Sequence, residues 1–178
     1  MTKQTMTIRK TTMADLTAVM DIYAQARAFM RENGNPGQWK TSHPAREIIE
    51  NDISGGLSYV CTTGGTEKPE KILAVFFFTT EPEPTYEKID GAWLDDSGTY
   101  GVIHRIARAA ADKEAKGAGE FCISWCFEQI PNIKIDTHPD NAPMLRLMEK
   151  LGFVQCGTIW LENGEERVAF QKLGVCTC

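Results

Sequence analysis

Residues Lys113 to Gly119, with the sequence KEAKGAG, have the composition of an anion-binding turn. They follow the strand-like run GVIHRIAR and precede the helix-like run FCISWCFEQ. Glycine disfavours a helix interior, but it permits a positive φ and lets a ligand approach without a Cβ in the way. The first N–H groups of a helix lack partners and carry partial positive charge. We therefore predict a phosphate site here, with Lys113 and Lys116 supplying further charge.

The turn alone does not identify the phosphate ligand. It lacks the Gly-Lys-Ser/Thr ending of a Walker A loop, and its Gly117-x-Gly119 core comes too late in the chain for a dinucleotide fingerprint. A left-handed loop packed against a sheet is an alternative that needs no ligand. The elements around the turn have to decide between these interpretations.

Apolar periodicity and chain breakers predict seven strands and four helices in the order β-α-α-β-β-β-α-β-α-β-β. The predicted strands are 5–10, 57–63, 72–80, 100–108, 133–137 and two within 153–172, about an Asn163-Gly164 turn. The predicted helices are 13–32, 45–53, 120–129 and 141–151. Strand 72–80 is apolar on both faces, which is typical of a central strand. Residues 81–98 are expected to form a long loop with a short helix.

The predicted helix ends carry recognisable caps. Thr12 and Asp15 form a capping-box variant before the first helix. Asn141 is an N-cap candidate and Gly152 a C-terminal cap for the last one. These elements predict a mixed α/β sheet in one domain, 1–178, with residues 171–178 as a flexible tail.

Composition limits the function classes. The chain has 178 residues, 42% of them hydrophobic and 24% charged, as in a globular domain. A net charge of -5 disfavours nucleic acid as a partner. No apolar run is long enough to span a membrane and the N-terminus lacks the apolar core of a signal peptide. We expect a cytoplasmic protein without a membrane partner; the sequence leaves a homodimer open.

The six cysteines show no metal-binding pattern. There is no C-x-x-C pair and no histidine cluster at metal spacing, so we expect no metal site. In a reducing compartment Cys61, Cys122, Cys126 and Cys156 are expected to act as small buried hydrophobes. Cys176 and Cys178 form a C-x-C at the end of the chain, for which a frayed tail is the simplest interpretation and a metal or redox role the alternative.

Two motifs resemble those of the GNAT superfamily of acetyl-CoA-dependent N-acetyltransferases. The first is the family's Gln/Arg-x-x-Gly-x-Gly/Ala turn, matched by Glu114, Gly117 and Gly119. The second is DNAPMLRLMEKLGF, which is similar to the family's Asn-x-x-Ala-x-x-Leu-Tyr-Glu-Lys-Leu-Gly-Phe segment. The motif spacing and element order extend the resemblance over nearly the whole chain. It implies the acyl-CoA N-acyltransferase fold, with a mostly antiparallel central sheet flanked by helices, and acetyl-CoA as co-substrate.

The resemblance also implies cofactor-binding residues, and two positions depart from the family pattern. The expected residues are Ile106, Ala107, Arg108, Lys113, Lys116, Gly117, Ala118, Gly119 and Asn141.

Glu114 stands where the family has Gln or Arg, and its carboxylate cannot favour a phosphate. Met148 stands where many members have a tyrosine that protonates the departing thiolate, and a thioether cannot donate a proton. Another group then donates, or the thiolate leaves unaided.

The implied reaction is direct attack of an amine on the acetyl thioester. An ammonium group must first lose its proton, which costs about 4 kcal/mol at pH 7 for a lysine-like amine. A backbone N–H near Ile106 or Ala107 would bind the oxyanion, as the family's fourth strand does. His104 is the first candidate for the base, because histidine titrates in the right range; a structural histidine within the sheet is the alternative. His138 and Glu81 are the second and third candidates.

The acceptor is expected to be a primary amine of a small molecule or peptide. By the resemblance, Trp39, Tyr86 and Trp93 would form an apolar or cation-binding wall. The segment 81–96 is also acidic, through Glu81, Glu83, Glu87, Asp90, Asp95 and Asp96. This charge favours an acceptor with more than one amine, such as a polyamine or an aminoglycoside-like compound; a solvated acidic loop is the alternative. Antibiotic, amino-acid and protein N-terminal acceptors remain open.

Two other functions compete with acetyl transfer. One is a CoA-binding or sensory domain of the same fold that has lost catalysis, which the replacement of the family tyrosine by Met148 would allow. The other is a different phospholigand protein that uses the same turn. An amine panel distinguishes the first, and competition of bound CoA by nucleotides distinguishes the second.

Overall fold

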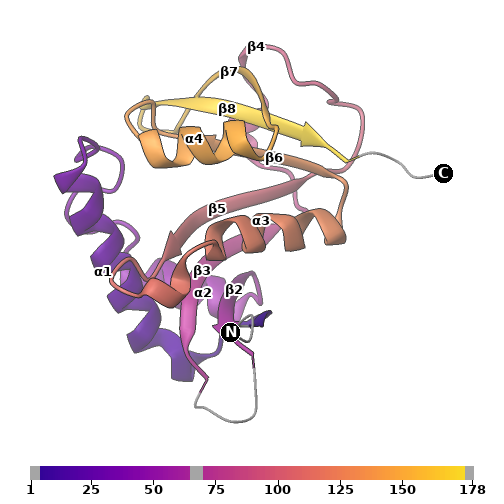
Figure 1. The fold of residues 1–178 in the computed structure, drawn as a ribbon. Coiled ribbons are helices and arrows are strands. Elements are labelled where there is room, and N and C mark those ends of the chain that lie inside the picture. Colours follow the sequence, from indigo (N-terminus) through magenta and orange to yellow (C-terminus); the bar gives the residue numbers. More distant parts are fainter. Residues whose placement is uncertain (1–4, 65–69, 175–178) are drawn as a thin grey trace. The chain divides into compact units, whose positions relative to one another are not determined.

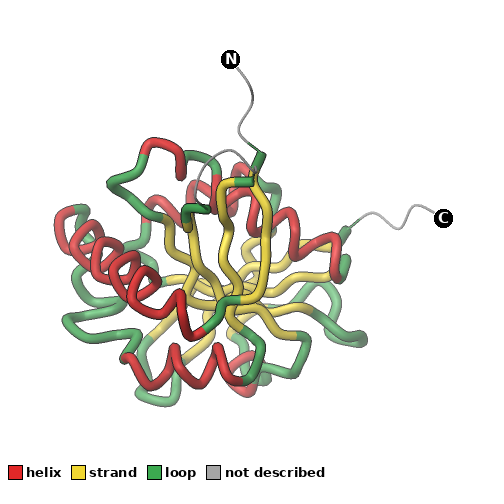
Figure 2. Tube along the Cα trace, turned by 90° about the horizontal axis from the view of Figure 1, so that it is seen from below, coloured by secondary structure: helices red, strands yellow, loops and turns green. Residues whose placement is uncertain are grey.

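A computed structural model describes residues 5–64 and 70–174. The chain has the expected mixed α/β fold, with a mostly antiparallel sheet in the strand order β1-β2-β3-β5-β6-β8-β7-β4. Its contacts form two compact units, one of Met1–Phe78 with Arg105–Trp125 and one of Thr79–His104 with Cys126–Cys178. Figure 2 separates helices from strands by colour. Each unit is described by itself.

The first unit contains three antiparallel strands, and two helices lie between the first strand and the second in the chain (Figure 1). Its elements are β1 (Met6–Lys10), η1 (Met13–Asp15), α1 (Leu16–Glu32), α2 (Arg46–Ser54), β2 (Ser58–Thr63) and β3 (Ile72–Thr79). The backbone N–H of Thr12 donates to Asp15 Oδ2 at 2.8 Å, which confirms the capping box before α1. β3 is buried along most of its length, as its apolar sequence predicts.

The second unit contains the C-terminal half of the fold. Its elements are η2 (Pro84–Tyr86), β4 (Asp90–Gly91), β6 (Asn132–Thr137), α4 (Ala142–Lys150), β7 (Val154–Trp160) and β8 (Glu166–Leu173). β7 and β8 form the expected hairpin, with Gly164 at a φ of 81°. The Lys172 ammonium on β8 donates to the Leu151 carbonyl at the end of α4. β8 continues to Leu173, so residues 171–173 belong to a strand and not to the expected tail; Cys176 and Cys178 lie outside the described residues.

The sheet has eight strands where the sequence predicted seven, and the additional strand is β4. It is two residues long and lies in the segment 81–98, where we expected only a loop with a short helix. Gly91 pairs with Gly157 of β7, and a Cβ at either position would clash with the opposing backbone. The close approach of two backbones therefore requires glycine on both strands.

Two elements belong to both units. β5 (Gly101–Arg108) passes from the second unit to the first between His104 and Arg105, and α3 (Ala118–Gln129) passes back between Trp125 and Cys126. Cys61, Cys122 and Cys126 are buried as expected, whereas Cys156 is half-buried. No helix among the described residues is long and apolar enough to cross a membrane.

Candidate active site

The predicted phosphate turn connects β5 to α3. A short η3 turn (Lys113–Ala115) precedes Gly117, whose φ is 85°, and α3 begins at the next residue. The helix therefore starts at Ala118, two residues earlier than we expected, and Gly119 lies inside its first turn. Only Gly117 uses the left-handed conformation that favours glycine.

The space above this turn is open. A Cβ built on Gly117 would meet no atom within 4 Å. Gly117 is exposed, as are Lys113 and Lys116, whereas Ala118 is buried. The geometry thus combines a helix N-terminus, an accessible backbone and two exposed ammonium groups, which together can bind a phosphate.

Acidic residues in the turn are paired with Lys71, which lies just before β3. Asp112 accepts a hydrogen bond from the Glu114 backbone N–H and thereby caps η3. Lys71, just before β3, forms ion pairs with Asp112 and, at 3.1 Å, with Glu114. The hydrogen bond from Lys71 is the main reason that the pKa of Asp112 is lowered. The hydrogen bonds to Asp112 and then Glu114 are the main reason that the pKa of Lys71 is raised. The carboxylate at the family's Gln/Arg position is therefore partly neutralised by Lys71.

The strand residues that lead to the turn are only briefly paired with β6. The parallel register of β5 with β6 consists of Gly101 opposite Ile133 and Val102 opposite Lys134. The three expected cofactor-binding residues of β5, Ile106 to Arg108, come after this pairing. Ile106 is half-buried, Ala107 is buried and Arg108 is exposed.

His104 lies between two carboxylates in the second unit. Its Nε2 atom is 2.9 Å from Glu83 Oε2, and its Nδ1 atom is 3.7 Å from Asp136 Oδ1. Asp136 in turn accepts a hydrogen bond of 2.7 Å from the Tyr86 hydroxyl. Glu83 is held from its other side, because its Oε1 accepts hydrogen bonds from the N–H and hydroxyl groups of Thr85. Three elements, η2, β5 and β6, thus bring together a histidine, two carboxylates and a phenol.

The electrostatics of this cluster favour an ionised Glu83 and a neutral Tyr86. The hydrogen bond with His104 is the main reason that the pKa of Glu83 falls to about 2. Burial and then the charge of Asp136 raise the pKa of the Tyr86 phenol well above its usual value. Glu83 therefore stays negative and Tyr86 neutral at physiological pH. Such a cluster can hold the imidazole in one orientation and stabilise it when it gains a proton.

The other two candidate bases, Glu81 and His138, do not contact His104 in the second unit. Glu81, the third candidate for the base, is exposed, and it is Glu83, two residues later, that contacts the His104 imidazole. His138 Nδ1 accepts a hydrogen bond from the backbone N–H of Asp140 at 3.1 Å. This contact shapes the turn before α4 and indicates a local structural role for His138.

The second family-like segment begins with the predicted cap. Asn141 Oδ1 accepts a hydrogen bond of 3.2 Å from the Met144 N–H at the start of α4. Gly152 has a φ of 73° at the other end of the helix, as its C-terminal position predicts. Met148, at the position of the family tyrosine, is fully buried. Its thioether packs in the core of the protein and offers no proton.

Two of the three aromatic residues expected to line the acceptor site are buried. Trp39 is 7% exposed and packs edge-on against Tyr23, with 5.7 Å between the ring centroids. Tyr86 is 2% exposed and packs against Trp93 at 5.2 Å. Trp93 is half-buried, and its indole N–H donates to the Tyr86 carbonyl. Trp39 and Tyr86 therefore contact the protein's own side chains instead of forming an open wall.

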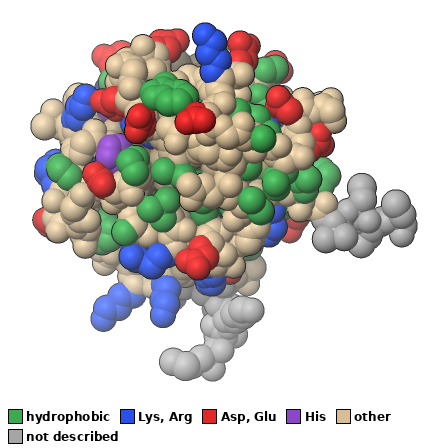
Figure 3. Space-filling model, turned by 90° about the horizontal axis from the view of Figure 1, so that it is seen from above, with side chains coloured by type: hydrophobic (Ala, Val, Ile, Leu, Met, Phe, Trp, Pro, Cys, Tyr) green, Lys and Arg blue, Asp and Glu red, His purple; other side chains and the backbone are tan. Residues whose placement is uncertain are grey.

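The cation that the aromatic residues hold is a lysine of the same chain. Lys134 Nζ lies 4.3 Å from the ring centre of Trp93 and 4.1 Å from that of Tyr100. It also pairs with Asp96 at 2.6 Å and is almost completely buried. Two of the six acidic residues, Glu83 and Asp96, are thus engaged by His104 and Lys134. On the face drawn in Figure 3, acidic, basic and apolar side chains are interspersed.

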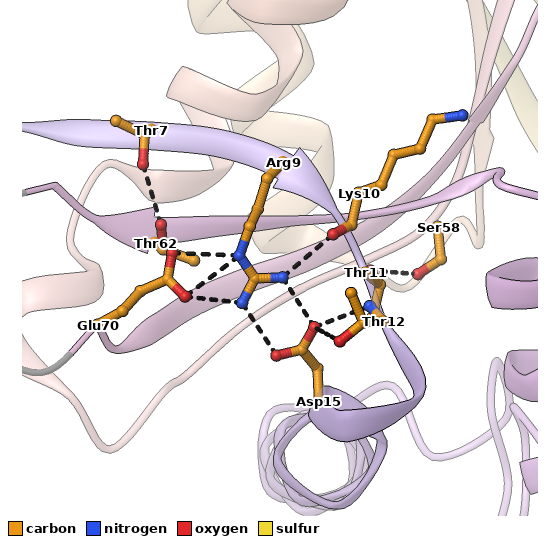
Figure 4. Close-up of polar contacts among 9 residues, drawn as sticks. All are labelled: Thr7, Arg9, Lys10, Thr11, Thr12, Asp15, Ser58, Thr62 and Glu70. Carbon is orange, nitrogen blue, oxygen red and sulfur yellow. Dashed lines mark hydrogen bonds and ion pairs between the residues drawn. The ribbon is translucent and has the colours of Figure 1, made fainter.

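A hollow of about 710 Å³ in the first unit adjoins the segment that leads to the turn. Its walls come from β1, α1, the start of β3 and residues 109–112. The Arg9 guanidinium bridges Asp15 and Glu70 there, with contacts of 2.8 Å to each (Figure 4). Because the Arg9 guanidinium is already paired with Asp15 and Glu70, we assign it a structural role: it holds β1, η1 and the start of β3 together.

Sequence reasoning missed Glu83, Asp136 and Lys71 as parts of these clusters. A signal existed for Asp136, because a carboxylate within a strand of the sheet must find a partner when it is buried. Glu83 could not be chosen over its acidic neighbours, since only the folded chain places it beside His104. Lys71 is far in sequence from the turn that it neutralises.

Comparison with known proteins agrees with this fold. No family model and no curated protein sequence matches the chain. Among solved structures, a GNAT-family acetyltransferase from Streptococcus agalactiae is 28% identical with a TM-score of 0.83, covering 96% of each chain. The ribosomal-protein-S18-alanine N-acetyltransferase of Escherichia coli is 14% identical with a TM-score of 0.55, covering 97% of this chain and 96% of its own. A NatC complex bound to Gag peptide and CoA contains a chain 10% identical with a TM-score of 0.56, covering 96% of this chain and 99% of its own.

Proposed function

We propose that this chain, which belongs to the GNAT superfamily, transfers an acetyl group from acetyl-CoA to a primary amine of a small molecule or peptide. The observation that carries the proposal is the turn between β5 and α3. There Gly117 adopts a φ of 85°, directly before a helix N-terminus and below open space. This arrangement fits the pyrophosphate of CoA, which needs backbone N–H donors and close approach. Lys113 and Lys116 would contact further phosphate oxygens.

The residues of β5 would bind the reacting end of the cofactor. A backbone N–H at Ile106 or Ala107 would donate to the thioester oxygen, where negative charge develops during attack. The amine nitrogen forms a bond to the acetyl carbon, and the carbon–sulfur bond then breaks to release the CoA thiolate. Met148 supplies no proton to this sulfur. A thiol is acidic enough for the thiolate to leave without one.

His104 would accept the proton of the attacking amine, directly or through water. In the tautomer in which Nε2 donates to Glu83, Nδ1 is the basic nitrogen. The imidazolium that forms would be stabilised by Glu83 at one nitrogen and by Asp136, 3.7 Å from the other. The same carboxylates would attract an ammonium group to the cluster. Glu83 and Asp136 thus orient the base and compensate its charge.

Several groups that could bind the acceptor amine are engaged by Lys134 of the same chain. Lys134 already occupies the faces of Trp93 and Tyr100, and Asp96 is paired with it, so these groups would not hold a second ammonium group of a polyamine. Of the acidic residues of the segment 81–96, Glu81, Glu87 and Asp90 are exposed and form no ion pair with the described residues. We therefore propose a primary amine without requiring a second positive group.

The deciding experiment combines binding with turnover. Calorimetry with CoA, in competition with free nucleotides, is expected to show a site that prefers CoA. Release of CoA thiol from acetyl-CoA is then followed against a panel of monoamines, polyamines, aminoglycosides, amino acids and peptides with free N-termini. CoA binding without turnover on any amine would favour the alternative, a catalytically inactive CoA-binding domain, which the buried Met148 allows. Displacement of CoA by nucleotides would reject both.

A further inference from the structure

Arg105 has an unusual backbone conformation in the middle of β5. Its φ is 52°, in the left-handed region that side chains other than glycine rarely adopt. Lys40 is the other non-glycine residue with a positive φ among the described residues, and it lies outside any strand. Arg105 follows the candidate base His104 and precedes the candidate oxyanion donor Ile106. Such a conformation persists only when surrounding contacts hold it.

Three residues of the first unit hold Arg105 in this conformation. Asp52 on α2 accepts hydrogen bonds from the guanidinium Nη2 at 2.7 Å and Nε at 3.1 Å. The guanidinium also lies over the Phe77 ring of β3, 4.6 Å from its centre. The hydroxyl of the buried Tyr23 on α1 donates to the Arg105 carbonyl at 3.0 Å. We call Tyr23, Asp52 and Phe77 the Arg105 clamp.

The clamp fixes the direction of one peptide group. In a planar trans peptide the C=O and the following N–H point in opposite directions. Because the Arg105 carbonyl is held toward Tyr23, the Ile106 N–H points away from Tyr23. An ordinary extended residue at 105 would turn this peptide differently, since successive peptide groups alternate in direction along a strand.

We propose that the Arg105 clamp positions the Ile106 N–H to donate to the acetyl oxygen of the bound cofactor. This inference rests on the proposed acetyl transfer and adds residues that act on the reaction without touching the substrate. Ile106 supplies the donor through its backbone, and Tyr23, Asp52 and Phe77 are positioning residues. A donor fixed before the reaction stabilises the developing oxyanion without reorganisation.

The test uses two substitutions at the same position. Arg105→Gly and Arg105→Ala both remove the guanidinium contacts, but only glycine adopts a positive φ readily. We expect Arg105→Ala to lower kcat by about 30-fold and Arg105→Gly by only about 3-fold, with the KM for acetyl-CoA nearly unchanged. Lys40→Gly and Lys40→Ala are the matched controls at the other positive-φ position and should leave kcat unchanged. Equal kcat values for the two Arg105 variants, both folded by circular dichroism, would overturn the clamp's role while leaving acetyl transfer intact.

A second readout does not depend on turnover. In the ¹⁵N-labelled protein, the Ile106 amide signal should shift more with acetyl-CoA than with CoA, because only acetyl-CoA carries the oxygen that accepts the bond. Tyr23→Phe, which removes only the hydroxyl that holds the Arg105 carbonyl, should abolish this difference while both ligands still bind. A wild-type signal that moves equally with both ligands would reject the inference even if no acceptor amine were found.

Discussion

His104 Nε2 lies 2.9 Å from Glu83 Oε2, so a strand histidine and a loop carboxylate form one hydrogen-bonded pair. The loop contains several other acids, and only the fold selects Glu83 among them. A carboxylate at one imidazole nitrogen fixes the tautomer and leaves the other nitrogen basic. The pair is therefore the centre from which the proposed proton transfer can be tested.

Replacing His104 should affect the reaction and not the cofactor. We expect His104→Ala to lower kcat/KM by about 10²-fold, because a positioned general base typically accelerates a reaction by at least that factor. Glu83→Gln keeps the shape but removes the charge and should lower kcat/KM by about 10-fold. The Kd of CoA, measured by calorimetry, should stay the same in both. Glu81→Gln decides between the two carboxylates: a loss as large as that of Glu83→Gln would contradict the assignment.

Gly117 should be required for CoA binding because of its backbone conformation. Gly117→Val forces a β-branched residue to a φ of 85° and places methyl groups in the open space above the turn. We expect CoA affinity to fall roughly tenfold, about 1.4 kcal/mol. Gly164→Val is the matched control, because Gly164 has a φ of 81° and equally open surroundings in the β7–β8 hairpin. If both variants bind CoA equally well, the turn does not hold the pyrophosphate.

Local signals predicted the features that depend on neighbouring residues. The capping box at Thr12 and Asp15, the cap at Asn141 and the positive φ of Gly117 each involve residues within a few positions. The central position of β3 followed from its apolar composition. Such features are set by backbone geometry and burial, which a short stretch of sequence already determines.

Features that depend on tertiary contacts could not be predicted from the sequence. Lys134 lies in a strand, and nothing in that strand shows that Trp93 and Tyr100 will surround its ammonium group. β4 forms because Gly91 and Gly157 permit a close approach of their backbones. A strand of two residues is too short for its sequence pattern to predict this pairing. The pairing of Glu83 with His104 likewise joins residues 21 positions apart.

The Arg9–Asp15 ion pair should make the stability of the protein depend on pH in acid. The hydrogen bond from Arg9 is the main reason that the pKa of Asp15 falls from 3.8 to about 2. A lowered pKa in the folded state stabilises the protein fully above pH 3.8, and this contribution disappears as the pH falls toward 2. Asp15→Asn should therefore lower the Tm at pH 6 and have little effect near pH 2. Asp21→Asn, at an exposed position of the following helix α1, is the control; an equal pH dependence in both variants would contradict the assignment.

Lys71 should tighten CoA binding by neutralising the acidic residues of the turn. Asp112 and Glu114 carry two negative charges, and Lys71, Lys113 and Lys116 carry three positive charges, so the balance is 3 − 2 = +1. Lys71→Met removes one positive charge and should weaken CoA binding about tenfold at low salt. Lys71 and Glu114 are exposed, so the loss of these surface charges should change the Tm little.

The companion variant Glu114→Gln tests this explanation through charge alone. It removes the carboxylate from the position where the family has Gln or Arg and should tighten CoA binding about threefold. In the double variant Lys71→Met/Glu114→Gln the balance returns to 2 − 1 = +1, so the Kd of CoA should lie near the wild-type value. Because exposed charges are screened over about 8 Å at physiological ionic strength, all these differences should shrink when the titration is repeated in high salt. A double variant that binds CoA as weakly as Lys71→Met alone would show that Lys71 acts by some route other than neutralising Glu114.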